Sequence, residues 1–154
     1  MKEKRSVLFV CTGNICRSPT AEAVFKRLVD EANLQHQVQV QSAGTHDYHV
    51  GEAPDARAQN HAKGRGYDLS TLRARRVAKS DFARHDLIVA MDRGHLKILQ
   101  RMCPPQYQAK LRLLVPGRDV PDPYYGGPEG FEEVLDLVEA GCRDLLAEIA
   151  SLTS

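Results

Sequence analysis

Short apolar runs alternate with helical patterns along the chain, and this alternation restricts its fold more than any other feature. Apolar runs typical of buried strands occupy residues 6–10, 38–44, 86–91 and 111–115. A segment with apolar residues at helical spacing follows each run. The first segment begins at residue 18, the second covers 54–64 or 54–66, the third includes 96–99, and the fourth covers 131–152. Parallel strands joined by helices are buried on both sheet faces. The chain is therefore predicted to form an α/β fold, a four-stranded parallel sheet flanked by helices on both faces.

The size and composition fit one globular domain that spans residues 1–154. The formal net charge at pH 7 is +1, which gives no sign of nucleic acid or an anionic membrane as a partner. The apolar segment 7–10 is too short for a signal peptide, and no apolar run approaches the ~20 residues of a membrane span. A cytoplasmic monomer is therefore predicted.

The chain has four cysteines, at positions Cys11, Cys16, Cys103 and Cys142. Without an export signal, and with enough residues for a real core, free thiols are expected rather than disulfides. A zinc site needs clustered ligands. Cys11 and Cys16 form no CxxC pair, and His46 and His49 stand alone in a predicted loop. Neither a metal site nor a cofactor is predicted.

The first predicted strand runs directly into a polar turn, in the stretch VLFVCTGNICRSPTAEAVF from residues 7 to 25. A loop between a strand and a helix can direct its backbone N–H groups, with the positive end of the helix dipole, at one anion. Gly13 adds no bulk, and Gly13 and Asn14 both tolerate a left-handed backbone. Ser18 is predicted to cap the helix, with Pro19 in its first position. The pattern predicts a phosphate-binding loop after the first strand.

Cys11 and Arg17 give this loop its chemistry. Arg17 can offer a planar fork to two phosphate oxygens. The positive field of the loop favours the thiolate form of Cys11, and a thiolate beneath a bound phosphate is an in-line nucleophile. The alternative is that Cys11 is a small buried residue at a strand end and Arg17 a surface charge. The glycine and asparagine between them, and the helix start after them, favour the catalytic interpretation.

These residues resemble the signature of the low-molecular-weight protein tyrosine phosphatases, which carry a C-x5-R-S loop near the N-terminus. The resemblance extends over almost the whole chain, through SAGTHDYHVGEAPDARA, MDRGHL and DPYYGG. It implies a hydrolase that cleaves phosphotyrosine through a cysteinyl-phosphate intermediate and needs no cofactor. It also implies phosphotyrosine-bearing proteins as substrates, with a bacterial tyrosine kinase as a candidate.

The resemblance assigns roles to further residues. Asp122, within PDPYY, matches the family's general acid, although an aspartate in a proline-rich turn is by itself typical of a turn former. Tyr48 and Tyr124 match the aromatic residues that flank the substrate ring. Ser18 matches the serine that hydrogen-bonds to the departing thiolate. The residues expected to bind the phosphate group are Thr12, Gly13, Asn14, Ile15, Cys16 and Ser18.

Cys16 lies inside the loop and has two interpretations. The resemblance implies a redox role, in which oxidised Cys11 forms a disulfide with Cys16 and escapes irreversible oxidation. The residue type alone is equally typical of a small side chain turned into the core.

One position departs from the family pattern. Many relatives carry a histidine in an H-x-A-R sequence that supports the loop asparagine, and Leu72 stands in its place here. Asn14 is therefore expected to bond to Ser42 or Ser18 instead, in a less rigid loop with slower catalysis. The arginines of segment 73–76 are expected to lie on a solvated face.

Two other functions compete with the phosphatase. An arsenate reductase of the same fold would need further cysteines near the loop to relay a disulfide, and the segment 79–92 has none. A phosphotyrosine-binding module without activity would lack part of the catalytic set. Cys11, Arg17 and Asp122 are all present. The sequence thus favours a protein tyrosine phosphatase.

Overall fold

The strands form one parallel sheet, as predicted. The computed structural model describes residues 4–124 and 126–153. The strands are β1 (Arg5–Cys11), β2 (Val38–Gly44), β3 (Leu87–Ala90) and β4 (Leu111–Leu113). Their order in the sheet is β2-β1-β3-β4, and every neighbouring pair is parallel. Because β1 lies in the middle, the loop that follows it opens at the centre of the sheet's carboxyl edge, where ligands of such folds bind.

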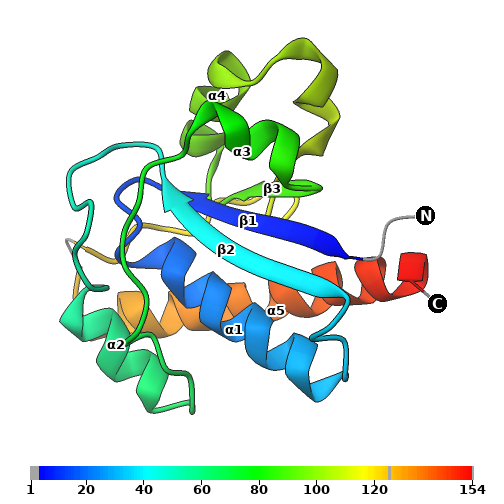
Figure 1. Cartoon of the computed structure of the whole chain (residues 1–154). Helices are drawn as coiled ribbons and strands as arrows, with labels where there is room; N and C mark the ends of the chain where they lie inside the picture. The colour runs from blue at the N-terminus through cyan, green and yellow to red at the C-terminus, as the bar shows by residue number, and fades with distance from the viewer. Residues whose placement is uncertain (1–3, 125, 154) are drawn as a thin grey trace.

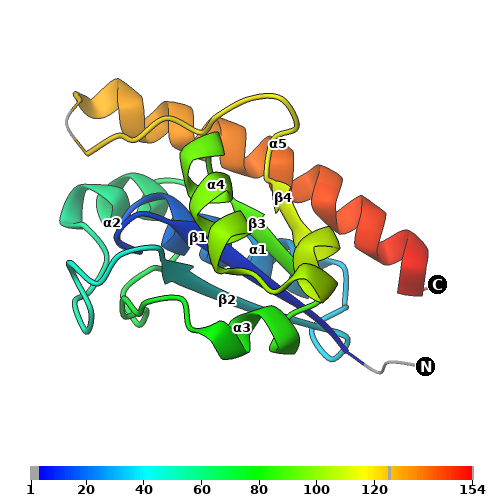
Figure 2. The same cartoon turned by 90° about the horizontal axis from the view of Figure 1, so that it is seen from above.

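Helices cover both faces of the sheet (Figure 1). One layer holds α1 (Arg17–Glu31), α2 (Ala56–Lys63) and α5 (Pro128–Thr153). The opposite layer holds α3 (Lys79–Arg84), α4 (Arg93–Met102) and the 3₁₀ helix η1 (Pro105–Lys110). Seen from above in Figure 2, α5 runs along the side of β4. No helix in the described part of the chain is long and apolar enough to cross a membrane.

The apolar run of β1 is continuous because both of its faces are buried. Val7 and Phe9 join the core shared with α1 and α5, where Phe9 meets Phe25 edge to face with ring centroids 5.6 Å apart. Leu8 and Val10 join the core on the opposite face. The strand therefore has no solvated side, and it fixes the start of the following loop firmly.

The helices differ from the predictions in several places. The helix α1 begins at Arg17, one residue before the predicted cap at Ser18. The last helix begins at Pro128 rather than near residue 131, because proline suits the first turn of a helix. The short helices α3 and η1, of six residues each, were not predicted, because six residues show too little periodicity to recognise.

Candidate active site

The loop that follows β1 is tied by its carbonyl groups to the segment after β2. The carbonyl oxygens of Cys11 and Thr12 accept hydrogen bonds from the backbone N–H groups of Thr45 and His46, at 2.8 and 3.0 Å. The carbonyl oxygen of Ile15 accepts one from the N–H of Asp55 at 2.8 Å. These bonds fix the course of the loop.

Asn14 holds the loop from inside, and it does so without the family's histidine. Its backbone is left-handed, with φ of 59°, and its side chain is buried. Its Nδ2 donates to Ser18 Oγ at 2.8 Å and Ser42 Oγ at 3.0 Å, as predicted. Its Oδ1 accepts from the N–H of Arg75 at 3.0 Å. Leu72, at the histidine's place, packs against the core instead.

Gly13 leaves room for a neighbouring side chain, and it does not use the left-handed conformation that glycine permits. The positive φ belongs to Asn14 alone among the loop residues. A Cβ atom on Gly13 would lie 2.8 Å from Cδ2 of His49, which is closer than carbon atoms approach. The imidazole of His49 therefore lies directly against the loop backbone.

Replacing Asn14 by alanine is expected to lower the free energy of unfolding by about 2–4 kcal/mol. About 1 kcal/mol comes from an alanine held at positive φ, and the rest from buried hydrogen-bonding groups left without partners. Asn14→Gly is the matched control, because it removes the same bonds without the backbone strain and should lose about 1 kcal/mol less. Denaturant unfolding measures both variants, and wild-type stability in both would contradict this account of the loop.

Ser18 bonds to the cysteine and does not cap the helix. It is the second residue of α1, and the cap position belongs to Cys16, whose side chain makes no capping bond. The Oγ of Ser18 lies 2.9 Å from Cys11 Sγ and is fully buried. Because this oxygen already accepts from Asn14, its own proton can go to the sulfur, 2.9 Å away, or to the carbonyl oxygen of Ala43, 3.4 Å away. The structure thus shows the contact with Cys11 that the family resemblance implied, and not the helix cap that the residue type suggested.

Arg17 is a buried cation with partners on both sides. Only 4% of its side chain is exposed, so its direction is set by the protein and not by solvent. Its Nη1 donates to Asp92 Oδ2 and to the carbonyl oxygen of Val120, each at 2.9 Å. Its Nη2 lies 3.8 Å from Asp122 Oδ2. The guanidinium thus connects the loop after β3 with the segment that carries Asp122.

A cleft of about 230 Å³ opens above the loop. The residues that line it are Cys11, Thr12, Gly13, Ile15, Cys16, Arg17, Tyr48, His49, Asp122 and Tyr124. The structure therefore brings together the three predicted catalytic residues and both predicted aromatic residues. Asn14 and Ser18 do not line the cleft, since their side chains are buried and bonded behind the loop.

Asp122 and the two tyrosines form the outer part of the cleft. Asp122 has 42% of its side chain exposed, so it can exchange protons with solvent, and its Oδ1 accepts from the N–H of Tyr124 at 3.0 Å. Tyr48 is 66% exposed and stacks on His46, with ring centroids 5.0 Å apart. The rim thus presents one carboxyl group and two tyrosine rings.

A comparison with protein families identifies the chain. The model of the low molecular weight phosphotyrosine protein phosphatases matches residues 6–153. The chain belongs to this family. It is a protein tyrosine phosphatase, a cysteine-dependent hydrolase whose substrates are phosphoproteins. The relatives favour this function over the arsenate reductase and the binding module that the sequence left as alternatives.

Named relatives and solved structures agree with the family model. The phosphatase is 51% identical over 152 residues to the low molecular weight protein-tyrosine-phosphatase of Streptomyces coelicolor, covering 93% of this chain and 92% of that one. It is 41% identical to the human low molecular weight phosphotyrosine protein phosphatase, covering 92% and 94%. The crystal structure of a protein tyrosine phosphatase from Entamoeba histolytica with Hepes in the active site superposes with a TM-score of 0.93, at 39% identity, covering 98% and 100%.

The contacts of His95 with the phosphate-binding loop of this phosphatase were not predicted from the sequence. This buried residue places Nε2 2.7 Å from Thr12 Oγ1 and 3.4 Å from Arg17 Nη2. Burial, together with the nearby Arg17, lowers the pKa of His95 to about 4. A neutral ring can accept from the Thr12 hydroxyl and face the arginine without repulsion. The histidine of MDRGHL was the available signal, but its contact with the loop spans 83 residues.

All four cysteines of the phosphatase are free, buried thiols. Cys16 lines the same cleft as Cys11, with 6% of its surface exposed. Burial raises the pKa of the Cys16 thiol far above its ordinary value, and the negative charge of Asp55 adds to the effect. Cys16 is thus held as a protonated thiol beside the candidate nucleophile. No group of three or more histidine, cysteine, aspartate or glutamate side chains suited to a metal ion occurs within residues 4–124 and 126–153.

Proposed function

We propose that this phosphatase cleaves phosphotyrosine by transferring the phosphoryl group to Cys11 Sγ and then to water. The observation that carries the proposal is the position of Cys11, which lines the cleft floor with Ser18 Oγ 2.9 Å from its sulfur. Arg17 and Asp122 line the same cleft. A nucleophile, a cation for the phosphate oxygens and a proton donor therefore meet around one space.

In the first step the Cys11 thiolate attacks phosphorus. An S–P bond forms while the bond from phosphorus to the phenol oxygen breaks, and Asp122 gives its proton to that oxygen. The N–H groups of residues 12–16 and the guanidinium of Arg17 hold the other phosphate oxygens. The hydrogen bonds that tie the loop carbonyls to residues 45–55 support this assignment, because they leave the N–H groups to serve the anion.

In the second step water replaces the sulfur. Asp122, now a carboxylate, takes a proton from the water while an O–P bond forms and the S–P bond breaks. The electron pair returns to Cys11 Sγ as a thiolate, which the Ser18 hydroxyl stabilises by donating a hydrogen bond. Inorganic phosphate leaves, and Asp122 is protonated again for the next cycle.

We assign the walls of the cleft to the substrate's aromatic ring. Tyr48 and Tyr124 can receive a flat phenyl group between them, which favours phosphotyrosine over the shorter phosphoserine. A related structure of Wzb from Vibrio vulnificus, 28% identical with a TM-score of 0.84, is a complex with benzylphosphonate, an aryl analogue of such a substrate. That complex supports an aryl phosphate as the ligand class.

Replacing Asp122 by alanine tests the proposal. Without the proton donor, kcat/KM toward phenyl phosphate, whose basic phenol needs a proton to leave, is expected to fall roughly 100-fold, within the usual range for a general acid. Activity is expected to be highest in mildly acidic solution, because Asp122 has to donate a proton while Cys11 attacks as a thiolate. The loss of activity above that optimum should disappear from the pH profile of the variant. Steady-state kinetics across the pH range measure both effects. An unchanged profile in the variant would remove Asp122 from this role.

We also propose a protective role for Cys16. Peroxide would oxidise the Cys11 thiolate to a sulfenic acid, and condensation with the Cys16 thiol would then form a disulfide and release water. The location of both residues in the lining of one cleft supports this step. The chain is further proposed to act as a one-domain cytoplasmic monomer, with a bacterial tyrosine kinase among its phosphoprotein substrates.

A further inference from the structure

The two sides of the catalytic cleft come from segments about a hundred residues apart, and an ion pair on α2 connects them. One side is the phosphate-binding loop of residues 11–17, and the other is the segment 121–124 that carries Asp122. Asp55 lies immediately before α2, and Arg57 is the second residue of that helix. Neither residue lines the cleft, and neither has a place in the chemical steps described above.

Asp55 fastens the start of α2 to the phosphate-binding loop. Its backbone N–H donates to the carbonyl oxygen of Ile15 at 2.8 Å. Its carboxylate caps the helix, where Oδ1 accepts from the N–H groups of Arg57 at 2.8 Å and Ala58 at 3.3 Å. A cap of this kind fixes the direction of the helix relative to the loop.

Arg57 extends from this cap to the opposite side of the cleft. Its Nε and Nη2 donate to the two oxygens of Asp55 at 3.2 and 2.9 Å, so the guanidinium plane is held at two points. Its Nη1 donates to the carbonyl oxygen of Tyr124 at 3.1 Å. The guanidinium carbon also lies over two aromatic rings, 5.2 Å from the centroid of Tyr124 and 5.0 Å from that of Phe131.

Tyr124 connects Arg57 with Asp122. The N–H of Tyr124 donates to Asp122 Oδ1 at 3.0 Å, while the carbonyl oxygen of Tyr124 accepts from Arg57. Asp122 Oδ2 is left facing Arg17, 3.8 Å away. A continuous series of hydrogen bonds therefore runs from the phosphate-binding loop through Asp55 and Arg57 to the carboxyl group.

We propose that Arg57 is a positioning residue, which holds the segment 121–124 so that the Asp122 carboxyl group faces the leaving-group oxygen. The inference rests on the proposed role of Asp122 as general acid. An error of about 1 Å in the position of a catalytic group can cost roughly 100-fold in rate, so a contact of this kind can matter although it never touches substrate. Lysine cannot replace Arg57 fully, because a single ammonium group lacks the planar fork of a guanidinium.

The ion pair persists in the mildly acidic solution where the phosphatase is expected to work. Burial by itself raises the pKa of Asp55, but hydrogen bonds from the Arg57 side chain and from two backbone N–H groups outweigh it, and the pKa lies below its ordinary value. A carboxylate of lowered pKa loses its stabilising contribution only as the pH falls through that value. Asp55 therefore stays ionised while Asp122 cycles between its two protonation states.

The dependence of rate on the leaving group separates positioning of the acid from general damage to the fold. The experiment measures kcat/KM for a series of aryl phosphates whose phenols range from acidic, such as para-nitrophenol, to strongly basic. Because the phenol departs in the first step, kcat/KM reports the step that Asp122 assists. A basic phenol needs the proton, whereas an acidic phenol leaves almost without it.

Arg57→Ala is expected to lower kcat/KM about tenfold for the basic phenols and less than about twofold for para-nitrophenol, since partial misplacement costs less than the loss of the acid. In an Asp122→Ala background the same substitution should have no further effect on the leaving-group dependence. Arg57→Lys should give an intermediate value, and it supplies the test if the alanine variant does not fold. Equal losses for all substrates, or an effect that persists without Asp122, would overturn the inference.

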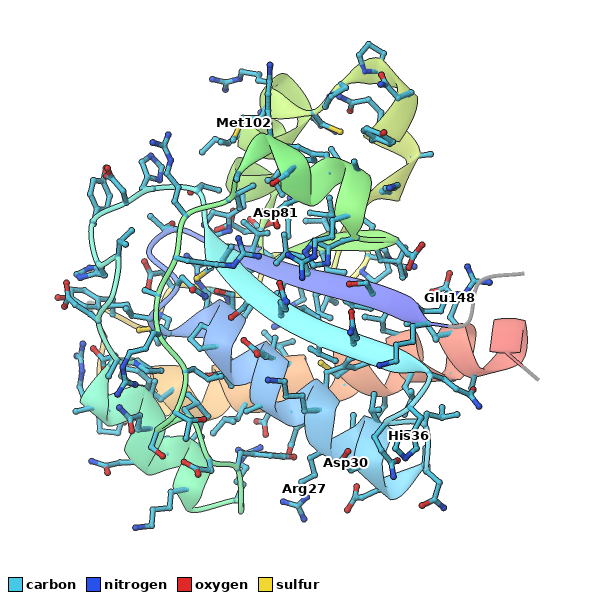
Figure 3. All side chains as sticks on the ribbon, in the orientation of Figure 1. Arg27, Asp30, His36, Asp81, Met102 and Glu148 are labelled. Carbon is cyan, nitrogen blue, oxygen red and sulfur yellow. The ribbon has the colours of Figure 1, made fainter. Side chains whose placement is uncertain are left out.

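Arg27 provides the matched control. Arg27 extends from α1, where Figure 3 labels it, and like Arg57 it is about half exposed. Its guanidinium lies over the ring of Tyr67 and donates to the carbonyl oxygen of Arg65, so it makes the same kinds of contact as Arg57. Arg27→Ala should leave the leaving-group dependence at its wild-type value, and a change equal to that of Arg57→Ala would contradict a specific role.

The failure of the proposed function can be told apart from the failure of this inference. If Asp122→Ala keeps the wild-type dependence of kcat/KM on the leaving group, the proposed function fails. If only the Arg57 variants keep that dependence, the positioning role alone fails.

Discussion

Cys11→Ser is expected to lower the rate of phosphate-ester hydrolysis by at least about 10⁴-fold, because an alcohol at this position is almost never ionised near neutral pH. The variant should still fold and bind phosphate. A serine oxygen can occupy the place of the sulfur and keep a hydrogen bond to Ser18, while the loop and Arg17 are unchanged. Hydrolysis of para-nitrophenyl phosphate, together with calorimetric binding of inorganic phosphate, measures both properties.

The matched control is Cys103→Ser. Cys103 is also buried, but it follows α4 and its thiol lies 3.4 Å from the carbonyl oxygen of Pro104. This variant should keep wild-type activity. Substantial hydrolysis by Cys11→Ser would remove Cys11 from the role of nucleophile and with it both chemical steps. Loss of hydrolysis in Cys103→Ser would show that the effect of a serine is not specific to position 11.

Arg17→Lys is expected to lower kcat/KM about 1,000-fold, although it conserves the charge. The guanidinium reaches Asp92 and the carbonyl oxygen of Val120 while leaving donors for the phosphate. One ammonium group cannot serve all three partners, and loss of a single charge-stabilising donor commonly costs 10²–10³-fold. The free energy of unfolding should also fall by about 1–3 kcal/mol, since buried acceptors lose their donors.

Steady-state kinetics and thermal unfolding test this expectation, with Arg112→Lys as the control. Arg112 is another paired arginine, whose Nη1 lies 2.6 Å from Glu148 Oε2, but it is remote from the cleft and partly exposed. Its replacement should change neither activity nor stability appreciably. A fully active Arg17→Lys variant would show that point charge alone suffices and that the fork geometry is unnecessary.

The fold was predictable where local pattern and tertiary packing agree. The continuous apolar run of β1 identified a strand buried on both faces, and the structure places α1 and α4 on opposite sides of it. The strand, loop and helix around Cys11 were predictable for the same reason. Their residue types each suit one local conformation, and the left-handed Asn14 is an example.

The rest of the site depends on contacts between distant segments, which one sequence does not display. By residue type alone Ser18 suits a helix cap, and only the family resemblance gave its hydroxyl the contacts with Cys11 and Asn14 that the structure shows. Arg75 looked like part of a solvated basic run. In the structure its N–H holds Asn14, and its guanidinium forms a bidentate pair with the buried Asp81, which Figure 3 labels near the start of α3.

The functional consequences of these contacts were equally hidden. His95 acts on a residue 83 positions away, and Arg57 on one 67 positions away. The substitution of Leu72 for the family's histidine suggested a loosened loop. The structure supplies Asn14 with three partners, two of which the sequence had offered as candidates, and slower catalysis stays a prediction.

The most direct test of the mechanism is to find the atom that carries phosphorus during turnover. The phosphatase is mixed rapidly with an aryl phosphate and quenched in denaturant within one turnover, and its peptides are examined by mass spectrometry. We expect one phosphoryl group, attached to Cys11 Sγ in the peptide that holds the phosphate-binding loop. A phosphoryl group on Ser18 or His95 instead, or release of phenol with no phosphorylated enzyme at any time, would contradict the central claim.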